Sequence, residues 1–322
     1  MKILVTGAAG FIGSHVSNTL LSQGHDVVGV DNINDYYDTA LKYDRLKWLG
    51  DFPFEQVDIS DQAKLHLVFQ QHQPEKVVHL AAQAGVRYSI ENPHAYITSN
   101  IIGFQNILEE SRLQNIKHLV YASSSSVYGN NEKIPFSTDD EVDHPISTYA
   151  ATKKSNELMA HVYSHLYGLP TTGLRFFTVY GPWGRPDMSP FLFADAIYND
   201  KPLKLFNNGH HKRDFTFIDD IVSGIIGVMA HIPAPCEQSG ARYKIYNIGN
   251  NKPVELIDYV RLFEEIIGKE AKKEMLGPQP GDVHETYADI SDISADVGYA
   301  PKTELKEGLR QFIRWYQSYY NL

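Results

Sequence analysis

The sequence of 322 residues is poor in cysteine, in long apolar runs and in positive charge. Its one cysteine, Cys236, excludes an intrachain disulfide and favours a reducing, cytoplasmic location. The longest uncharged apolar run, residues 221–232, is too short to span a bilayer, and no signal peptide precedes the first predicted strand. The 29 basic and 39 acidic residues give a net charge of −10, which argues against a nucleic-acid-binding surface. We therefore expect a cytoplasmic protein with no membrane and no nucleic-acid partner.

A strand, a glycine-rich turn and a helix open the chain. Residues 2–6 form a short apolar run that is typical of a buried strand, and residues 14–22 have helical character. Three glycines with the spacing G-x-x-G-x-x-G lie between them, namely Gly7, Gly10 and Gly13. Such glycines allow a tight turn and the close approach of a pyrophosphate, which the helix N-terminus binds through its free amides. Taken alone, the same three glycines are also compatible with a purely structural turn.

An acidic residue, Asp31, ends the second predicted strand over residues 26–30. It follows the glycine turn by about 20 residues, where dinucleotide-binding folds hold a ribose hydroxyl. Its carboxylate would repel a 2′-phosphate, so we expect NAD rather than NADP. A third strand over residues 54–57 leads to Asp58 and Ile59, which we place on the adenine side. The predicted cofactor-binding residues of this part of the chain are Gly7, Gly10, Phe11, Ile12, Gly13, Asp31, Asn32, Asp58, Ile59 and Ala81.

Strand and helix patterns alternate up to residue 177, which predicts an α/β fold with a Rossmann-type doubly wound parallel sheet. The further predicted strands cover residues 76–80, 118–122 and 171–177, and the longest predicted helices cover residues 62–72, 95–112 and 149–167. Ligands of such sheets bind beyond the carboxyl ends of the strands. Several of the candidate residues lie at such ends, namely Gly7, Asp31, Asp58, Ala81 and Ser124.

The pattern changes to shorter elements with more proline and glycine from residue 178 onward. We therefore predict an NAD-binding Rossmann domain over residues 1–177 and a smaller α/β substrate-binding lobe over residues 178–322. A helix over residues 218–231 and a strand over residues 244–248 are expected to return to the large domain. The two domains are thus predicted to be interleaved.

Tyr149 and Lys153 lie four residues apart at the start of a predicted helix, so their side chains share one face. A free phenol has a pKa of about 10, and a nearby cation favours the phenolate. At an effective dielectric of about 20, a unit charge at 4 Å contributes roughly 4 kcal/mol. Tyr149 is therefore a candidate general base near neutral pH. The same spacing recurs at Tyr43 and Lys47 without a preceding serine run, so the spacing by itself also fits a solvated helix face.

With these motifs in place, the chain resembles the extended short-chain dehydrogenase/reductase family over nearly its whole length. The three glycines match its phosphate loop, and Ser124, Tyr149 and Lys153 match its catalytic serine, tyrosine and lysine. Ser124 is chosen because it stands three residues before Val127-Tyr128-Gly129, as in related nucleotide-sugar epimerases. The residues themselves leave open which serine of the run 123–126 is catalytic.

Within that family the sequence is most similar to UDP-glucuronate 4-epimerases. The similarity is carried by residues 31–46, 84–89 and 177–188, and UDP-glucose epimerases usually carry Asn where Thr178 stands. The resemblance implies NAD as cofactor and inversion at carbon-4 of a UDP-sugar through a transient 4-keto sugar. Tyr149 would take the proton of the 4-hydroxyl, Lys153 would hold the phenolate and bond the nicotinamide ribose, and Ser124 would donate to the forming ketone.

The substrate residues implied by the resemblance fall into two groups. Ser125, Ser126 and Thr178 would hold the sugar carboxylate with neutral hydrogen bonds and Arg185 with a charged one, although Arg185 also fits a solvated loop arginine. At the nucleotide end, Arg213 is expected on the diphosphate and Asp282 on the uridine ribose. Gln279 and Arg87 complete the predicted substrate-binding set. No metal site is predicted, because no cysteine or carboxylate stands at metal-ligand spacing from His210 and His211 in the sequence.

Alternative functions stay open at this stage. UDP-glucuronate decarboxylase is disfavoured because that enzyme typically has an acidic residue where Ser126 stands, and a UDP-glucose or UDP-N-acetylglucosamine 4-epimerase is a further enzyme alternative. A catalytically silent, NAD-sensing binding protein is the alternative of another class. The resemblance also implies a homodimer, built through the helices over residues 95–112 and 149–167.

Overall fold

In residues 1–277 and 285–322, which the computed structural model describes, seven parallel strands form one central sheet. In spatial order they are β10 (Tyr243–Ile248), β6 (Thr171–Phe176), β5 (His118–Ser124), β4 (Lys76–His79), β1 (Lys2–Thr6), β2 (Asp26–Asp31) and β3 (Phe54–Gln56). The chain order reverses between β1 and β4, as in a doubly wound dinucleotide-binding sheet. The predicted fold class is therefore confirmed.

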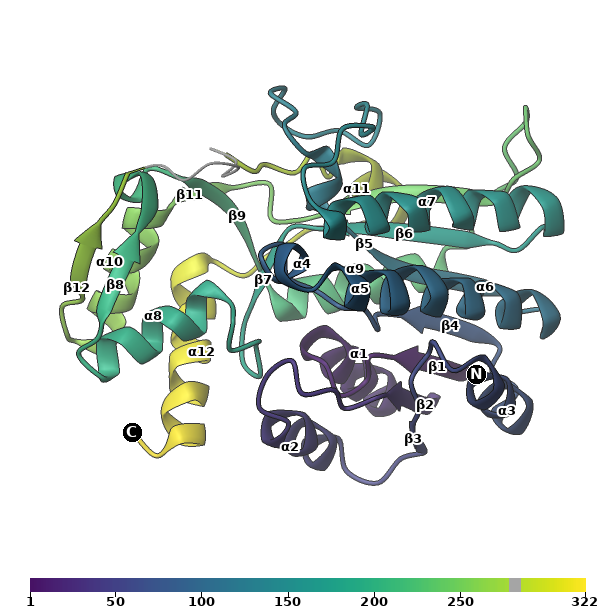
Figure 1. Ribbon diagram of the computed structural model, residues 1–322, viewed down its shortest axis with the longest axis horizontal. Helices are drawn as coiled ribbons and strands as arrows, with labels where there is room; N and C mark the ends of the chain where they lie inside the picture. The colour runs from purple at the N-terminus through teal and green to yellow at the C-terminus, as the bar shows by residue number, and fades with distance from the viewer. Residues whose placement is uncertain (278–284) are drawn as a thin grey trace.

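Helices cover both faces of this sheet (Figure 1). One face carries α1 (Phe11–Ser22) and α9 (Ile218–Ala230), and the other carries α3 (Gln62–His72), α6 (Gly103–Leu113) and α7 (Thr148–Tyr167). The side chains of strand β1 show why both faces of the sheet need to be covered. Ile3 and Val5 pack into the apolar cluster of the first face, and Leu4 into that of the second. Because successive side chains of a strand point to opposite faces, a strand covered on both sides is apolar throughout.

The predicted helix over residues 95–112 consists of three consecutive helical segments. They are α5 (Pro93–Tyr96), the π-helix η1 (Ile97–Ile102) and α6. Asn100, inside the π-helix, bonds the backbone N–H and C=O of Gln83 through its side chain, at 2.8 and 3.0 Å. Its own carbonyl accepts from Asn156 Nδ2 at 2.6 Å. These bonds join α7 to the segment that follows β4. Short π-helical segments such as η1 are often found at functional sites.

A second group of elements follows residue 177. It contains a sheet of β7 (Thr178–Tyr180), β9 (Lys212–Phe217) and β11 (Pro253–Glu255) and a pair of β8 (Pro202–Leu205) and β12 (Lys272–Met275). Around β8 and β12 lie α8 (Ser189–Tyr198), α10 (Leu256–Ile267) and α12 (Leu305–Tyr320), at the left of Figure 1. The remaining helices are α2 (Ala40–Leu49), α4 (Tyr88–Glu91), η2 (Ser125–Tyr128), η3 (Phe206–Gly209) and α11 (Ser291–Val297).

Elements from both parts of the sequence are interleaved in space. Strand β10 pairs with β6 at one end of the large sheet, and α9 packs on β5 of that sheet. The assignment of an NAD-binding domain to residues 1–177 and of a nucleotide-sugar-binding lobe to residues 178–322 stays a prediction. Across the described part of the chain, no helix combines the length and the apolar character that crossing a membrane requires.

Three buried histidines bond neutral partners next to the sheet. His79 Nδ1 lies 2.8 Å from Thr6 Oγ1, His118 Nε2 lies 2.9 Å from Thr172 Oγ1, and His15 Nε2 donates to the Pro182 carbonyl at 3.0 Å. Burial lowers the pKa of His79 to about 3 and the pKa values of His15 and His118 to about 4. The folded protein therefore holds these three imidazoles neutral.

The free energy of unfolding should fall as pH falls from about 6.5 toward 5. In this window the histidines bind protons in the unfolded state and not in the folded state. Proton binding therefore stabilises the unfolded state, and the free energy of unfolding falls by up to about 1.4 kcal/mol per pH unit for each histidine. Urea unfolding at several pH values measures the slope. His118→Gln should flatten it, and His94→Gln, at an exposed position, should not. A slope of zero in the unmodified protein would contradict the assignment.

Candidate active site

A cleft of about 1070 Å³ opens along the carboxyl edge of the large sheet. Its walls include the residues that end or follow five strands, namely Gly7, Asp31, Ala81, Ser124 and Phe176. This is the edge where doubly wound sheets bind their ligands. The structure thus places these candidate residues at the carboxyl edge of the large sheet, as the sequence predicted.

The turn between β1 and α1 has no room for side chains at its glycines. A Cβ atom on Gly13 would lie 1.9 Å from the Gly7 carbonyl oxygen, and one on Gly7 would lie 2.8 Å from the Ala81 nitrogen. Gly7 also has φ of +72°, which favours glycine. Helix α1 begins at Phe11, three residues before the predicted start at residue 14. Phe11 and Ile12 therefore lie in the first turn, where free amides and the helix dipole favour phosphate.

Two carboxylates line the cleft beyond the glycine turn. Asp31 accepts from the backbone N–H of Ala9 at 3.2 Å and of Ile33 at 2.9 Å. Burial raises the pKa of Asp31, and the Lys42 charge opposes that rise. Asp58 accepts from Asn32 Nδ2 at 2.9 Å through one oxygen and from Ser60 through the other. Each carboxylate keeps lone pairs for the hydroxyl or amine donors of a dinucleotide.

Arg45 is a residue of this region that sequence reasoning did not single out. Its side chain is fully buried and donates to the Trp183 and Gly184 carbonyls, to the Ala9 carbonyl and to the Tyr37 hydroxyl, at 2.7–3.0 Å. Arg45 thereby ties the glycine turn to the loop that carries Arg185. In the sequence, the only indication of a role for Arg45 was its place in the stretch 31–46. Its hydrogen-bond partners could not be predicted, because they lie up to 139 residues away along the chain.

The predicted catalytic residues meet in the same cleft. Ser147 caps α7 by accepting from the Ala150 N–H at 3.1 Å, so Tyr149 and Lys153 lie in the first turns of that helix. Ser124 ends β5, and its hydroxyl donates to Ser126 Oγ at 3.1 Å and lies near enough to the Tyr149 phenol to lower the pKa of that phenol. Lys153 is 2% exposed and donates from Nζ to the Ala122 carbonyl at 2.9 Å.

Opposing effects act on the pKa of Tyr149. Burial raises this pKa, while the hydroxyl of Ser124 and the charge of Arg185 lower it. Burial also lowers the pKa of Lys153 to about 8. Arg185 is thus a cation near the candidate base that sequence reasoning had assigned only to the sugar carboxylate. The expected effect of Lys153 on the phenolate stays a prediction.

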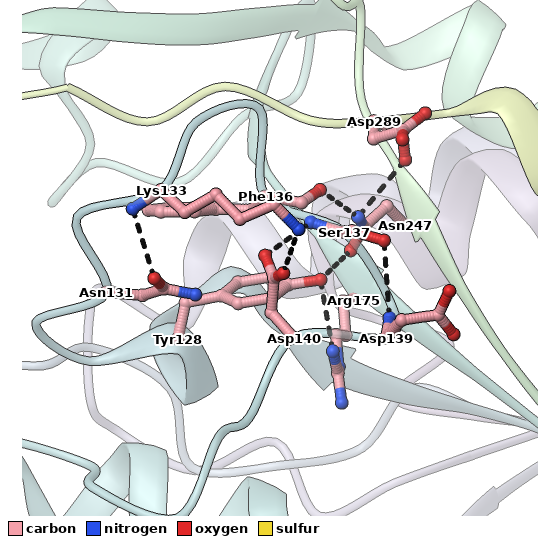
Figure 2. Close-up of polar contacts among 10 residues, drawn as sticks. All are labelled: Tyr128, Asn131, Lys133, Phe136, Ser137, Asp139, Asp140, Arg175, Asn247 and Asp289. Atoms are coloured by element: carbon pink, nitrogen blue, oxygen red, sulfur yellow. Dashed lines mark hydrogen bonds and ion pairs between the residues drawn. The ribbon is translucent and has the colours of Figure 1, made fainter.

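A buried polar network supports the turn that follows Ser124. Figure 2 shows the Tyr128 hydroxyl between Asn247, to which it donates at 2.6 Å, and Arg175, from which it accepts at 3.0 Å. Asn247 Nδ2 in turn donates to the carbonyls of Phe136 and Asp289, at 2.7 and 3.1 Å. The loop after Tyr128 and the segment after residue 284 are thus fixed to β10. Sequence reasoning missed this network because its members are far apart along the chain.

The predicted substrate residues within the described part of the chain also line the cleft. They are Arg87, Ser125, Ser126, Thr178, Arg185 and Arg213. Arg185 pairs with Asp187, and the Arg87 guanidinium lies 5.6 Å from the centre of the Phe206 ring. Gln279 and Asp282 lie outside the described residues. The roles assigned to all of these residues, and to the cofactor and catalytic residues, stay predictions. Among residues 1–277 and 285–322 no three His, Cys, Asp or Glu side chains are grouped to hold a metal ion.

A doubly wound sheet with a glycine-only phosphate turn, a carboxylate at the end of β2 and a Ser-Tyr-Lys cluster at its edge defines a dinucleotide-dependent enzyme of the short-chain dehydrogenase type. Comparison with known families narrows this class. The model of the NAD dependent epimerase/dehydratase family matches residues 3–249, and the chain belongs to that family.

Individual relatives are similar over the whole chain. Protein CapI of Staphylococcus aureus is 57% identical over 99% of this chain and 99% of its own length. UDP-glucuronate 4-epimerase 2 of Arabidopsis thaliana is 48% identical over 99% of this chain and 76% of that protein. Among solved structures, the UDP-glucuronic acid 4-epimerase of Bacillus cereus, in complex with UDP-glucuronic acid and NAD, is 36% identical with a TM-score of 0.89. That match covers 99% of this chain and 100% of that one.

Tyr149→Phe should remove most of the turnover of the enzyme while leaving its fold intact. The change deletes one hydroxyl and little packing, and the loss of a general base typically slows a reaction by roughly 100- to 10,000-fold. Tyr43→Phe is the matched control, because Tyr43 has a lysine four residues on but is 52% exposed. Steady-state rates and circular dichroism of both variants decide the matter. Equal losses of rate in the two variants would defeat the assignment.

Proposed function

We propose that this protein inverts the configuration at carbon-4 of a UDP-sugar with NAD as cofactor, and that it converts UDP-glucuronate to UDP-galacturonate. The observation that carries the proposal is the meeting of Ser124, Tyr149 and Arg185 in one cleft. A base and a hydroxyl donor serve the chemistry at carbon-4. A cation beside them suits a sugar that bears a carboxylate.

The residues of the cleft fit NAD. The glycine turn and the α1 N-terminus would hold the pyrophosphate, Asp31 a ribose, and Asp58 and Ile59 the adenine side. Asp31 also disfavours the 2′-phosphate of NADP. When bound, NAD supplies a reversible hydride acceptor. Lys153, four residues after Tyr149 on α7, is the candidate for the nicotinamide ribose.

The chain's own groups would move the proton and stabilise charge. Tyr149, as phenolate, takes the proton of the 4-hydroxyl while hydride leaves carbon-4. Ser124 donates a hydrogen bond to the oxygen as it becomes a ketone. After the 4-keto sugar has turned over in the cleft, Tyr149 returns its proton to the same oxygen and hydride returns to the other face of carbon-4. The configuration is inverted without net oxidation.

The carboxylate of the sugar must stay in place during this reaction, because a 4-keto glucuronate is a β-keto acid that loses carbon dioxide readily. Ser125, Ser126 and Thr178 offer neutral hydrogen bonds and Arg185 offers a charged one. No acidic side chain stands at Ser126 to serve as an additional acid in a decarboxylase. At the nucleotide end, Arg213 is the candidate for the diphosphate.

Incubation with UDP-glucuronate and NAD, followed by proton NMR, tests the proposal. UDP-galacturonate should be the product, since the cleft has a base and a carboxylate partner but no further acid at residue 126. A UDP-pentose would instead identify a decarboxylase. A protein that binds NAD and converts no UDP-sugar would be the silent sensor.

We further propose that the protein is a cytoplasmic homodimer. The location rests on the free thiol of its one cysteine, Cys236. The dimer rests on an apolar face that α6 and α7, side by side in Figure 1, leave exposed. Leu158, Val162 and Leu166 follow one another at four-residue spacing on α7, and are 57%, 47% and 62% exposed. Ile102, the last residue of η1, and Leu113, the last residue of α6, are both 47% exposed.

Light scattering at micromolar concentration should give the mass of a dimer. Leu158→Glu with Leu166→Glu should give a monomer, because two buried charges would face their symmetry mates. Leu67→Glu, on α3 at 61% exposure, is the control and should stay dimeric. A monomer mass for the unmodified protein would overturn the proposal.

A further inference from the structure

Three separate stretches of the sequence meet at Tyr36, which follows β2. The Tyr36 hydroxyl donates to Asp187 Oδ2 at 3.1 Å, and its ring centre lies 4.9 Å from that of Tyr88. A Cβ atom on Gly85 would lie 2.7 Å from the Tyr36 hydroxyl oxygen, so only glycine fits there without a shift. Residues 31–46, 84–89 and 177–188 are therefore linked by one side chain, although nothing in their sequences relates them.

Asp187 holds the Arg185 guanidinium along one edge. Arg185 Nε lies 3.0 Å from Asp187 Oδ1, and Nη2 lies 2.5 Å from Oδ2. The rigid fork of an arginine leaves its Nη1 end for a second acceptor. Both side chains are only partly solvated, with 22% of Arg185 and 31% of Asp187 exposed. Their charges therefore act more strongly on a ligand in the cleft than those of a surface pair.

The three groups keep fixed charge states. Burial and the Asp187 charge raise the pKa of Tyr36 to about 12, so its phenol stays a donor. Burial raises the pKa of Asp187, but the charge and hydrogen bonds of Arg185 outweigh it and hold that pKa below its usual value. Arg185 thus faces the cleft with an anion already bound to it, while its charge still reaches Tyr149.

We propose that Asp187, fastened by Tyr36, is a specificity-determining positioning residue that aims Arg185 at the substrate and offsets part of its charge. The inference rests on the proposed function and deepens it. Arg185 alone would bind a sugar carboxylate tightly in one orientation. With Asp187 on its other edge, Arg185 binds the carboxylate firmly enough to select it and weakly enough to release it when the 4-keto sugar turns over. Asp187 acts through Arg185 and not on carbon-4.

The test compares Asp187→Asn with Arg185→Ala, using calorimetric titration of each NAD-loaded protein with UDP-glucuronate and with UDP-glucose. Asp187→Asn removes a negative charge near the ligand carboxylate and keeps a hydrogen-bond acceptor for Arg185. It should tighten UDP-glucuronate on the order of tenfold and leave UDP-glucose unchanged within about twofold. Arg185→Ala should weaken UDP-glucuronate alone, by roughly 10- to 150-fold.

Turnover of UDP-glucuronate gives a second readout that a merely structural role would not move. Asp187→Asn should lower KM and kcat together, because it stabilises the bound sugar without helping it to turn over. Asp139→Asn is the matched control, because it removes one carboxylate charge at an exposed position outside the lining of the cleft, and its ratio of the two affinities should stay within about threefold of the original.

Weaker binding of UDP-glucuronate by Asp187→Asn, or equal changes for both ligands, would overturn the inference. So would a lower kcat with an unchanged KM. The affinities do not depend on turnover. If the unmodified protein binds both nucleotide sugars but does not convert UDP-glucuronate, the proposed function fails and the affinities still decide the role of Asp187.

Discussion

A buried ion pair between Glu157 of α7 and Arg175 of β6 holds the catalytic edge of the sheet together. Arg175 Nε and Nη2 donate to the two Glu157 oxygens, both at 2.9 Å, and the side chains are 4% and 3% exposed. Ser123 donates to the same carboxylate at 2.6 Å, and Tyr128 accepts from the third arginine nitrogen. Loss of one partner from such a pair typically costs about 3–5 kcal/mol. The helix of the candidate base and the strand of the candidate serine are thereby fixed to each other.

Burial at this edge of the sheet disfavours the charged forms of the candidate catalytic groups. It raises the pKa of Tyr149 and lowers that of Lys153 to about 8. Burial strengthens the remaining electrostatic contacts, so the charge of Arg185 lowers the pKa of Tyr149. Asp187 pairs with the same guanidinium. Arg185 thus acts on the candidate base and on a carboxylate of the protein itself.

The sequence predicted the sheet and its functional edge because both depend on local patterns. Apolar strands such as residues 2–6 and the glycine spacing that follows are visible within a few residues. The start of α1 was placed three residues late, since the glycines hide the first helical turn. The partners of Arg45 and the pair of Tyr36 with Asp187 were out of reach, because these contacts join residues up to 151 positions apart. The burial of Lys153, which lowers its pKa to about 8, could not be predicted either, because hydration depends on the assembled fold.

The central claim is that hydride leaves carbon-4 of a UDP-sugar and returns to the same atom inside the cleft. Its most direct test uses UDP-glucuronate with deuterium at carbon-4, incubated with the protein in ordinary water and analysed by mass spectrometry and NMR. The account predicts UDP-galacturonate that retains its deuterium at carbon-4. Replacement of the deuterium by hydrogen from the solvent would contradict it.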